Sequence, residues 1–170
     1  MVKLQEAIKL AVSAHDGQVD KAGMPYILHP MRVMLAVAKE AKTHPLAGYT
    51  LGELMIAAML HDVVEDTQVT LKQIENTFGG VVALIVDALS HRSGEVYRAF
   101  ILRAKENPAA RLIKVADVLD NLSRIDSLPP EQQGIESRYR TALTVLNGTR
   151  ELSLEIANEY KMKQQPEVGA

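Results

Sequence analysis

One short segment, HDVVEDT at residues 61–67, gathers the ionisable side chains best suited to chemistry. It follows a strongly apolar stretch, so one imidazole and three carboxylates lie directly after residues that are expected to be buried. On a helix, His61 and Glu65 would share one face, and Asp62 and Asp66 the neighbouring one. Near a helix end, the adjacent His61 and Asp62 side chains can reach a single cation. Taken alone, the segment is explained equally well by a helix end whose polar residues meet water.

A polar stripe on a second predicted helix is the next candidate. Lys114, Asp117, Asn121 and Arg124 follow one another at intervals of three and four residues, which places them on one helix face. A solvated face produces the same stripe and is the usual explanation. Asp117, however, is surrounded by apolar residues within 115–119, and a carboxylate buried there needs a cation or several hydrogen-bond donors.

The third candidate is His29, in the segment PYILHP at residues 25–30. A histidine in such a setting is more often a hydrogen-bonded structural group than a ligand, but the proline after it restricts the backbone and suits a ligand held in one pose. His29, His61, Asp62 and Asp117 together offer two imidazoles and two carboxylates, whose formal charge of −2 balances one divalent cation. Mixed nitrogen and oxygen ligation suits Mn, Fe or Zn, and four protein ligands leave room for water and a substrate oxygen.

The elements that position these residues are predicted to be helices. Apolar residues recur at helical spacing in four segments, which begin with Leu4, Met34, Leu51 and Tyr139. No segment alternates with period two for long enough to demand a sheet. We therefore expect an all-α bundle of roughly seven or eight helices, with residues 1–161 as one domain and 162–170 as a flexible tail.

Local signals predict where several of these helices begin and end. Thr50 with Glu53, and Thr70 with Gln73, are capping-box pairs that predict helices starting near residues 51 and 71. Gly79-Gly80 is expected to end the second of these helices, and Pro108 lies well for the first turn of another. The segment from Asp16 to Pro30, with its glycines and prolines, is expected to form an ordered loop between two helices.

Composition narrows the class of protein. A net charge of −2 over 170 residues gives no bulk attraction to nucleic acid or to an anionic membrane, so local cations must offset the charge of any polyphosphate ligand. Cysteine is absent, which excludes disulfides and thiolate chemistry and agrees with a reducing compartment. The amphipathic N-terminal segment carries Lys and Glu throughout and has no uninterrupted apolar run. We expect a cytoplasmic protein.

These motifs resemble the hydrolase domain of the RelA/SpoT alarmone enzymes, and most closely the single-domain small alarmone hydrolases. The resemblance runs from about residue 11 to 121 and continues more weakly through the last helices. Its markers are AHDGQ (14–18), GMPYILHP (23–30), LHDVVEDT (60–67), FGGVVALIVDAL (78–89) and IKVADVLDNL (113–122). HDVVEDT, preceded by PYILHP and followed by the VAD…N helix, is highly specific to this family.

The resemblance implies that the all-α bundle is of the HD-domain type and that residues 1–161 form a hydrolase domain, which removes the 3′-pyrophosphate of alarmone nucleotides in the stringent response. It implies Mn²⁺, or another divalent cation, on the four residues that the charge arithmetic favoured. The family's Glu-Asp pair falls on Glu65 and Asp66, which would orient or deprotonate the attacking water. Asn121 matches an asparagine that contacts the nucleoside, and Lys21 and Tyr26 match positions that line the nucleotide site. Lys114 and Arg124 are the nearest further sources of positive charge for the phosphates.

The chain also departs from the longer relatives near the nucleotide. They usually carry Arg-Lys where this chain has Asp20-Lys21, and they tend to have Arg at the positions of Val118 and Ser123. A guanidinium at the first position can stack on a purine, whereas Asp cannot. Guanine is therefore expected to lose part of its advantage, and (p)ppGpp and (p)ppApp both remain candidate substrates.

Several further residues have two interpretations. His15 extends the apolar stripe of the first helix and is expected to be a structural helix-end group. His91 and Arg92, with Glu95 and Tyr97 after them, lie where they could meet a phosphate, but a solvated helix start explains Glu95 equally well.

Two other functions compete with alarmone hydrolysis. One is another HD-type phosphohydrolase, such as a nucleotidase or a phosphatase of a dinucleotide 2′-phosphate (an NADPH phosphatase), which would release orthophosphate instead of pyrophosphate. The other is a non-catalytic alarmone-binding module, against which the intact set of ligands and acids argues. We expect a small-molecule nucleotide as the partner, with no nucleic acid and no membrane. The sequence does not identify a protein partner.

Overall fold

The computed structural model describes residues 2–43 and 47–148, and within these ranges the regular elements are helices joined by turns and loops, with an isolated antiparallel bridge between Val19 and Pro25. The α-helices are α1 (Val2–Ala14), α2 (Leu28–Glu40), α3 (Leu51–Met59), α4 (Val63–Asp66), α5 (Leu71–Phe78), α6 (Gly80–Leu89), α7 (Tyr97–Glu106), α8 (Pro108–Ser123) and α9 (Glu136–Asn147). Two 3₁₀ helices, η1 (Ile125–Ser127) and η2 (Pro130–Ile135), lie between α8 and α9. The predicted all-α bundle is confirmed. The predicted tail, residues 162–170, lies outside the described residues.

The predicted helix boundaries follow from local hydrogen bonds. The side chains of Thr50 and Thr70 each accept a hydrogen bond from the backbone N–H three residues on. The side chains of Glu53 and Gln73 accept one from the backbone N–H of Thr50 and Thr70, so both capping boxes are present. Pro108 opens α8, capped by the side chain of Asn107. Gly79 separates α5 from α6 with φ of +99°, a conformation that glycine adopts without the steric cost of a Cβ.

One expectation about the chain path was wrong in detail. The loop after α1 ends at Ile27 and not at Pro30, which lies in the first turn of α2. A proline is tolerated there because the first turn has no intrahelical partner for its missing N–H. The HDVVEDT segment does lie at a helix end: α3 ends at Met59, and His61 lies in a turn before α4 begins at Val63.

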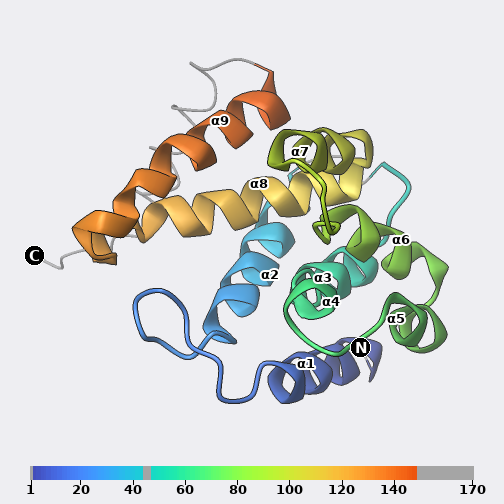
Figure 1. Ribbon diagram of the computed structural model, residues 1–170. Coiled ribbons are helices and arrows are strands. Elements are labelled where there is room, and N and C mark those ends of the chain that lie inside the picture. The colour runs from blue at the N-terminus through green and yellow to red at the C-terminus, as the bar shows by residue number, and fades with distance from the viewer. Residues whose placement is uncertain (1, 44–46, 149–170) are drawn as a thin grey trace, which may run out of the picture.

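Helix α8 is shared by two apolar clusters, and it runs through the middle of the molecule in Figure 1. Its N-terminal half contributes Ala109, Ala110, Ile113 and Ala116 to a cluster that includes buried side chains of α1, α2, α3, α5 and α6. Its C-terminal half contributes Val118, Leu119 and Leu122 to a second cluster with α7, η1 and α9. No helix in the described ranges has the length and apolar character needed to cross a membrane.

Candidate active site

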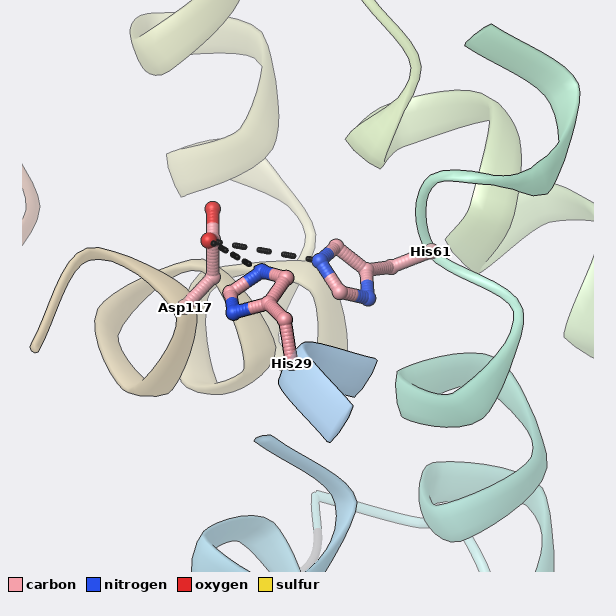
Figure 2. Close-up of side chains that lie close together, drawn as sticks. All are labelled: His29, His61 and Asp117. Carbon is pink, nitrogen blue, oxygen red and sulfur yellow. Dashed lines mark ion pairs between the residues drawn. The ribbon is translucent and has the colours of Figure 1, made fainter. Parts of the chain in front are cut away.

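Two histidines and an aspartate from three separate parts of the chain meet beside α8 (Figure 2). His29 comes from the first turn of α2, His61 from the turn between α3 and α4, and Asp117 from α8. One potential ligand atom from each lies within 4.8 Å of the others. The Nε2 atom of His29 is 3.2 Å from Asp117 Oδ1, and that of His61 is 4.0 Å from the same oxygen. All three residues are buried.

The Nδ1 atoms of both histidines are already engaged. His61 Nδ1 lies 2.8 Å from the carbonyl oxygen of Ala58, and because a carbonyl only accepts, Nδ1 carries the hydrogen. Its Nε2 is buried and forms no well-aligned hydrogen bond within residues 2–43 and 47–148, although a carboxylate oxygen of Asp62 lies 3.0 Å away. His29 Nδ1 lies 2.8 Å from a carboxylate oxygen of Asp120. Each imidazole therefore points Nε2 toward the cluster, in the orientation that metal-ligating histidines adopt.

Asp62 completes the cluster from the same turn as His61. Its Oδ2 lies 3.0 Å from His61 Nε2 and 3.7 Å from His29 Nε2, and it accepts a hydrogen bond of 2.5 Å from the Tyr26 hydroxyl. The same hydroxyl lies 3.3 Å from Asp66 Oδ2. Two carboxylates therefore converge on one phenol, beside the histidine pair.

The electrostatics of the cluster favour charged groups despite their burial. Burial opposes a charge on His29, but hydrogen bonds to Asp117 and Asp120 raise its pKa to about 10. Burial also acts to raise the pKa of Asp117, yet the Lys114 charge and the His29 hydrogen bond hold it well below its usual range. Without a cation, protons and Lys114 balance these buried carboxylates, so a cation that bound here would have to displace protons.

The predicted stripe on α8 faces this cluster and is not a solvated surface. Lys114 Nζ lies 2.7 Å from Asp117 Oδ2, and it also lies over the ring of Phe100, 4.7 Å from its centroid. Asn121 donates a 2.7 Å hydrogen bond to Asp117 Oδ1. At the end of the helix, Arg124 pairs with Asp20 at 2.7 Å. In this structure Lys114 and Asn121 therefore hold the Asp117 carboxylate in place.

A cleft of about 480 Å³ opens over the cluster. Every site residue predicted from the sequence lines it except His61, which is fully buried. Its wall also includes aromatic and aliphatic side chains that the sequence did not single out for the site, namely Phe100, Leu128, Ile135 and Tyr139. The cleft thus combines a charged floor with partly apolar walls, as small-molecule sites commonly do.

Asp120 and Arg32 are functional candidates that sequence reasoning missed. Asp120 accepts from His29 Nδ1 and forms a two-point pair with Arg32, whose Nε and NH2 lie 2.7 and 2.9 Å from its two oxygens. The signal was present, because Asp120 stands three residues after Asp117 and Arg32 three residues after His29. Such a carboxylate fixes the orientation of a ligating imidazole.

Glu65 is anchored from outside its own helix. Its Oε2 accepts a 2.8 Å hydrogen bond from the backbone N–H of His91, in the loop between α6 and α7. Arg103 fastens that loop by donating to the carbonyl oxygens of Asp87 and Ser90 and to both carboxylate oxygens of Glu95. The position of Glu65 thus depends on a loop that the Arg103–Glu95 pair holds in place.

We expect Glu95→Gln to lower the free energy of unfolding at pH 7 by weakening this pair. The hydrogen bonds from Arg103 lower the pKa of Glu95 to about 2. A lowered pKa stabilises the fold above the ordinary value of 4.5, and this contribution fades as the pH falls toward 2. Urea unfolding of both proteins from pH 7 to pH 3 measures the difference, which should narrow below pH 4.5. A difference that stays constant over this range would contradict the assignment.

The helical bundle and its buried His/Asp cluster define a helical domain with a candidate divalent-cation site at the floor of a cleft. A solved structure described as a metazoan ortholog of SpoT that hydrolyses ppGpp superposes with a TM-score of 0.74 and 27% identity, covering 94% of this chain and 95% of that one. The HD-domain family matches residues 7–99.

Curated relatives agree with this match. A guanosine-3′,5′-bis(diphosphate) 3′-pyrophosphohydrolase of Aquifex aeolicus is 35% identical over 72% of this chain, and the bifunctional (p)ppGpp synthase/hydrolase SpoT of Escherichia coli is 32% identical over 77%. The chain spans less than a fifth of the length of these two proteins. The Danio rerio pyrophosphohydrolase MESH1 is 33% identical over 95% of this chain and 91% of its own length. The chain therefore belongs to the HD-domain family, in its RelA/SpoT-type group.

Proposed function

We propose that this protein hydrolyses the 3′-pyrophosphate of alarmone nucleotides, (p)ppGpp or (p)ppApp, in a metal-dependent reaction that releases pyrophosphate. One observation carries the proposal: two imidazole Nε2 atoms and two carboxylates converge at the floor of a cleft, with Glu65 and Asp66 beside them. The names of the relatives support the same activity.

We assign His29, His61, Asp62 and Asp117 as ligands of one divalent cation, and propose Mn²⁺. The residues fit such an ion, because the buried Nε2 of His61 forms no well-aligned hydrogen bond to any described residue, and the Nε2 atoms of both histidines face carboxylate oxygens. Mixed imidazole and carboxylate ligands suit Mn²⁺ as well as Fe and Zn. When bound, the ion would supply Lewis-acid stabilisation of the negative charge on the phosphate oxygens.

Glu65 and Asp66 are the proposed catalytic pair. Both line the cleft, and neither belongs to the group of three residues whose ligand atoms lie within 4.8 Å of one another. Burial, followed by the charges of Asp62 and Glu65, raises the pKa of Asp66, and this makes it a better proton acceptor than an ordinary aspartate. The pair would orient the attacking water and take its proton. The water oxygen would bond to the 3′ phosphorus as the bond between that phosphorus and the 3′ oxygen breaks, and the 3′ oxygen would take up a proton as pyrophosphate leaves.

The proposed substrate contacts divide into two kinds. Lys21 is exposed, lines the cleft and is available to a phosphate. Tyr26, Lys114 and Asn121 are bonded to Asp62 or Asp117, so they would fix the proposed ligands as well as contact substrate. Arg124, at the end of α8, is the fifth proposed contact.

A panel of nucleotides tests the function directly. The protein, supplied with Mn²⁺, should convert guanosine or adenosine 3′-pyrophosphates to the 3′-hydroxyl nucleotide and pyrophosphate, as read by product chromatography. Release of orthophosphate from nucleotides or from NADPH, without pyrophosphate, would favour a nucleotidase or phosphatase. Tight nucleotide binding without turnover in any divalent metal would favour the non-catalytic module.

A further inference from the structure

An ion pair joins the loop after α1 to the C-terminal end of α8. Arg124 NH1 lies 2.7 Å from Asp20 Oδ2, and the two side chains are 25% and 15% exposed. Both residues line the cleft. The pair therefore connects two segments that are 104 positions apart in sequence, at the wall of the proposed nucleotide site.

Asp20 is fully engaged in this arrangement. Its Oδ1 accepts hydrogen bonds of 2.9 Å from the backbone N–H groups of both Ala22 and Met24, while its own N–H donates to the carbonyl of Met24 at 2.8 Å. These bonds close the tight loop tip, in which Gly23 has φ of +76°. With Oδ1 holding the loop and Oδ2 holding Arg124, Asp20 is placed to orient the arginine and not to bind a ligand itself.

Arg124, by contrast, keeps one edge of its guanidinium available. Asp20 pairs with NH1, and within residues 2–43 and 47–148 neither Nε nor NH2 has a hydrogen-bond or ion-pair partner. These two nitrogens form a parallel pair of donors that fits two adjacent acceptors. Arg124 stands seven residues after Asp117, about 10 Å along the helix axis at 1.5 Å per residue. That separation suits a group at the far end of a nucleoside whose 3′ phosphates lie over the cluster.

We propose that Asp20 is a positioning residue that presents Arg124 to the purine base, and that this pair selects guanine over adenine. The inference rests on the proposed function and deepens it. Guanine offers two adjacent acceptors, O6 and N7, to a forked arginine, whereas adenine replaces O6 with an amino donor that opposes the guanidinium. A guanidinium is thus supplied to this wall of the cleft from α8. The proposal is opposite to the expectation that guanine loses part of its advantage, and the ratio of activities on the two bases decides between them.

The test is the ratio of kcat/KM for guanosine and adenosine 3′-pyrophosphates that carry the same 5′-diphosphate. Arg124→Gln should lower the guanine-to-adenine ratio by about 10-fold or more, the scale of a lost forked contact to a base. Arg124→Lys should not restore it, because an ammonium lacks the fork. Asp20→Asn keeps an acceptor for the loop but weakens the hold on Arg124, so the ratio should fall in the same direction, by about 3-fold. Glu75→Gln, which breaks the exposed pair with Lys72 on α5 away from the cleft, is the matched control and should leave the ratio unchanged.

Three results would overturn the proposal. The first is a wild type that does not prefer guanine. The second is an Arg124→Gln loss that is equal for both bases and disappears when the 5′-diphosphate is removed, which would place Arg124 on a phosphate. The third applies if no 3′-pyrophosphate is cleaved and the proposed function itself fails. The ratio of the dissociation constants for guanosine and adenosine 5′-diphosphate then still measures the choice of base. The same ratio in the wild type and in Arg124→Gln would refute the contact.

Discussion

Asp117→Asn should abolish both divalent-ion binding and hydrolysis, the largest effect that we expect from any single substitution. The change removes the charge from a carboxylate whose Oδ1 lies 3.2 Å from His29 Nε2 and 4.0 Å from His61 Nε2, while keeping the volume of the side chain and a hydrogen-bond acceptor. Asparagine is the better choice than alanine, because alanine would leave the buried Lys114 ammonium without its partner, a loss on the scale of about 3–5 kcal/mol of stability. Elemental analysis and calorimetric titration with Mn²⁺ measure the loss, and circular dichroism checks that the helices remain.

Asp120→Asn provides a matched comparison on the same helix. Asp120 is also a buried aspartate of α8, but it contacts the Nδ1 side of His29 and does not face the cluster. Loss of its charge should weaken metal affinity by roughly 10–100-fold without eliminating binding. If Asp117→Asn retains its full metal content, or if the two variants lose metal equally, the division between ligand and supporting residue is wrong.

Glu65→Gln should retain metal and substrate binding but lose turnover by roughly 10²–10⁴-fold, the scale of a missing general acid or base. The glutamine side chain keeps a carbonyl oxygen that can accept the bond from the His91 N–H, so the local geometry should survive the change. The amide cannot accept a proton from water. Single-turnover hydrolysis and equilibrium nucleotide binding, measured on the same preparation, separate the two effects.

Arg103→Lys is the informative companion to this variant. This substitution weakens the bonds from residue 103 to Ser90 and Glu95, which hold the loop that positions Glu65. The Glu65 side chain itself is unchanged and can still accept a proton. A small loss of kcat in Arg103→Lys beside a large one in Glu65→Gln is the expected result. A Glu65→Gln protein that loses its metal would instead make Glu65 a ligand.

The parts of the fold that depend on local chemistry could be predicted from the sequence. The capping boxes at Thr50 and Thr70 and the proline at the start of α8 act through neighbours in the chain, so their signals are written within a few residues. The turn at His61 could not be read in this way. Its surroundings favour helix, and the break at residues 60–62 places His61 where its Nε2 faces the cluster.

The candidate site shows the same division. Residue types and charge balance singled out His29, His61, Asp62 and Asp117, because buried ionisable groups are unusual enough to be noticed. Partners that act through space were invisible, as with Asp120 beside His29 or the His91 N–H beside Glu65. The Asp20–Arg124 pair is the clearest case, since each residue alone is an ordinary surface charge and only the fold brings them together.

The place of α8 in both apolar clusters has a consequence for synthesis of the chain. Three of the four proposed ligands have been synthesised by residue 62, but the fourth is added only with α8. The first cluster also needs the N-terminal half of that helix to cover its core. A nascent chain that stops before residue 108 therefore exposes the apolar surface of the first cluster and lacks a complete set of ligands, so synthesis of α8 supplies both the last proposed ligand and the last helix of the first cluster.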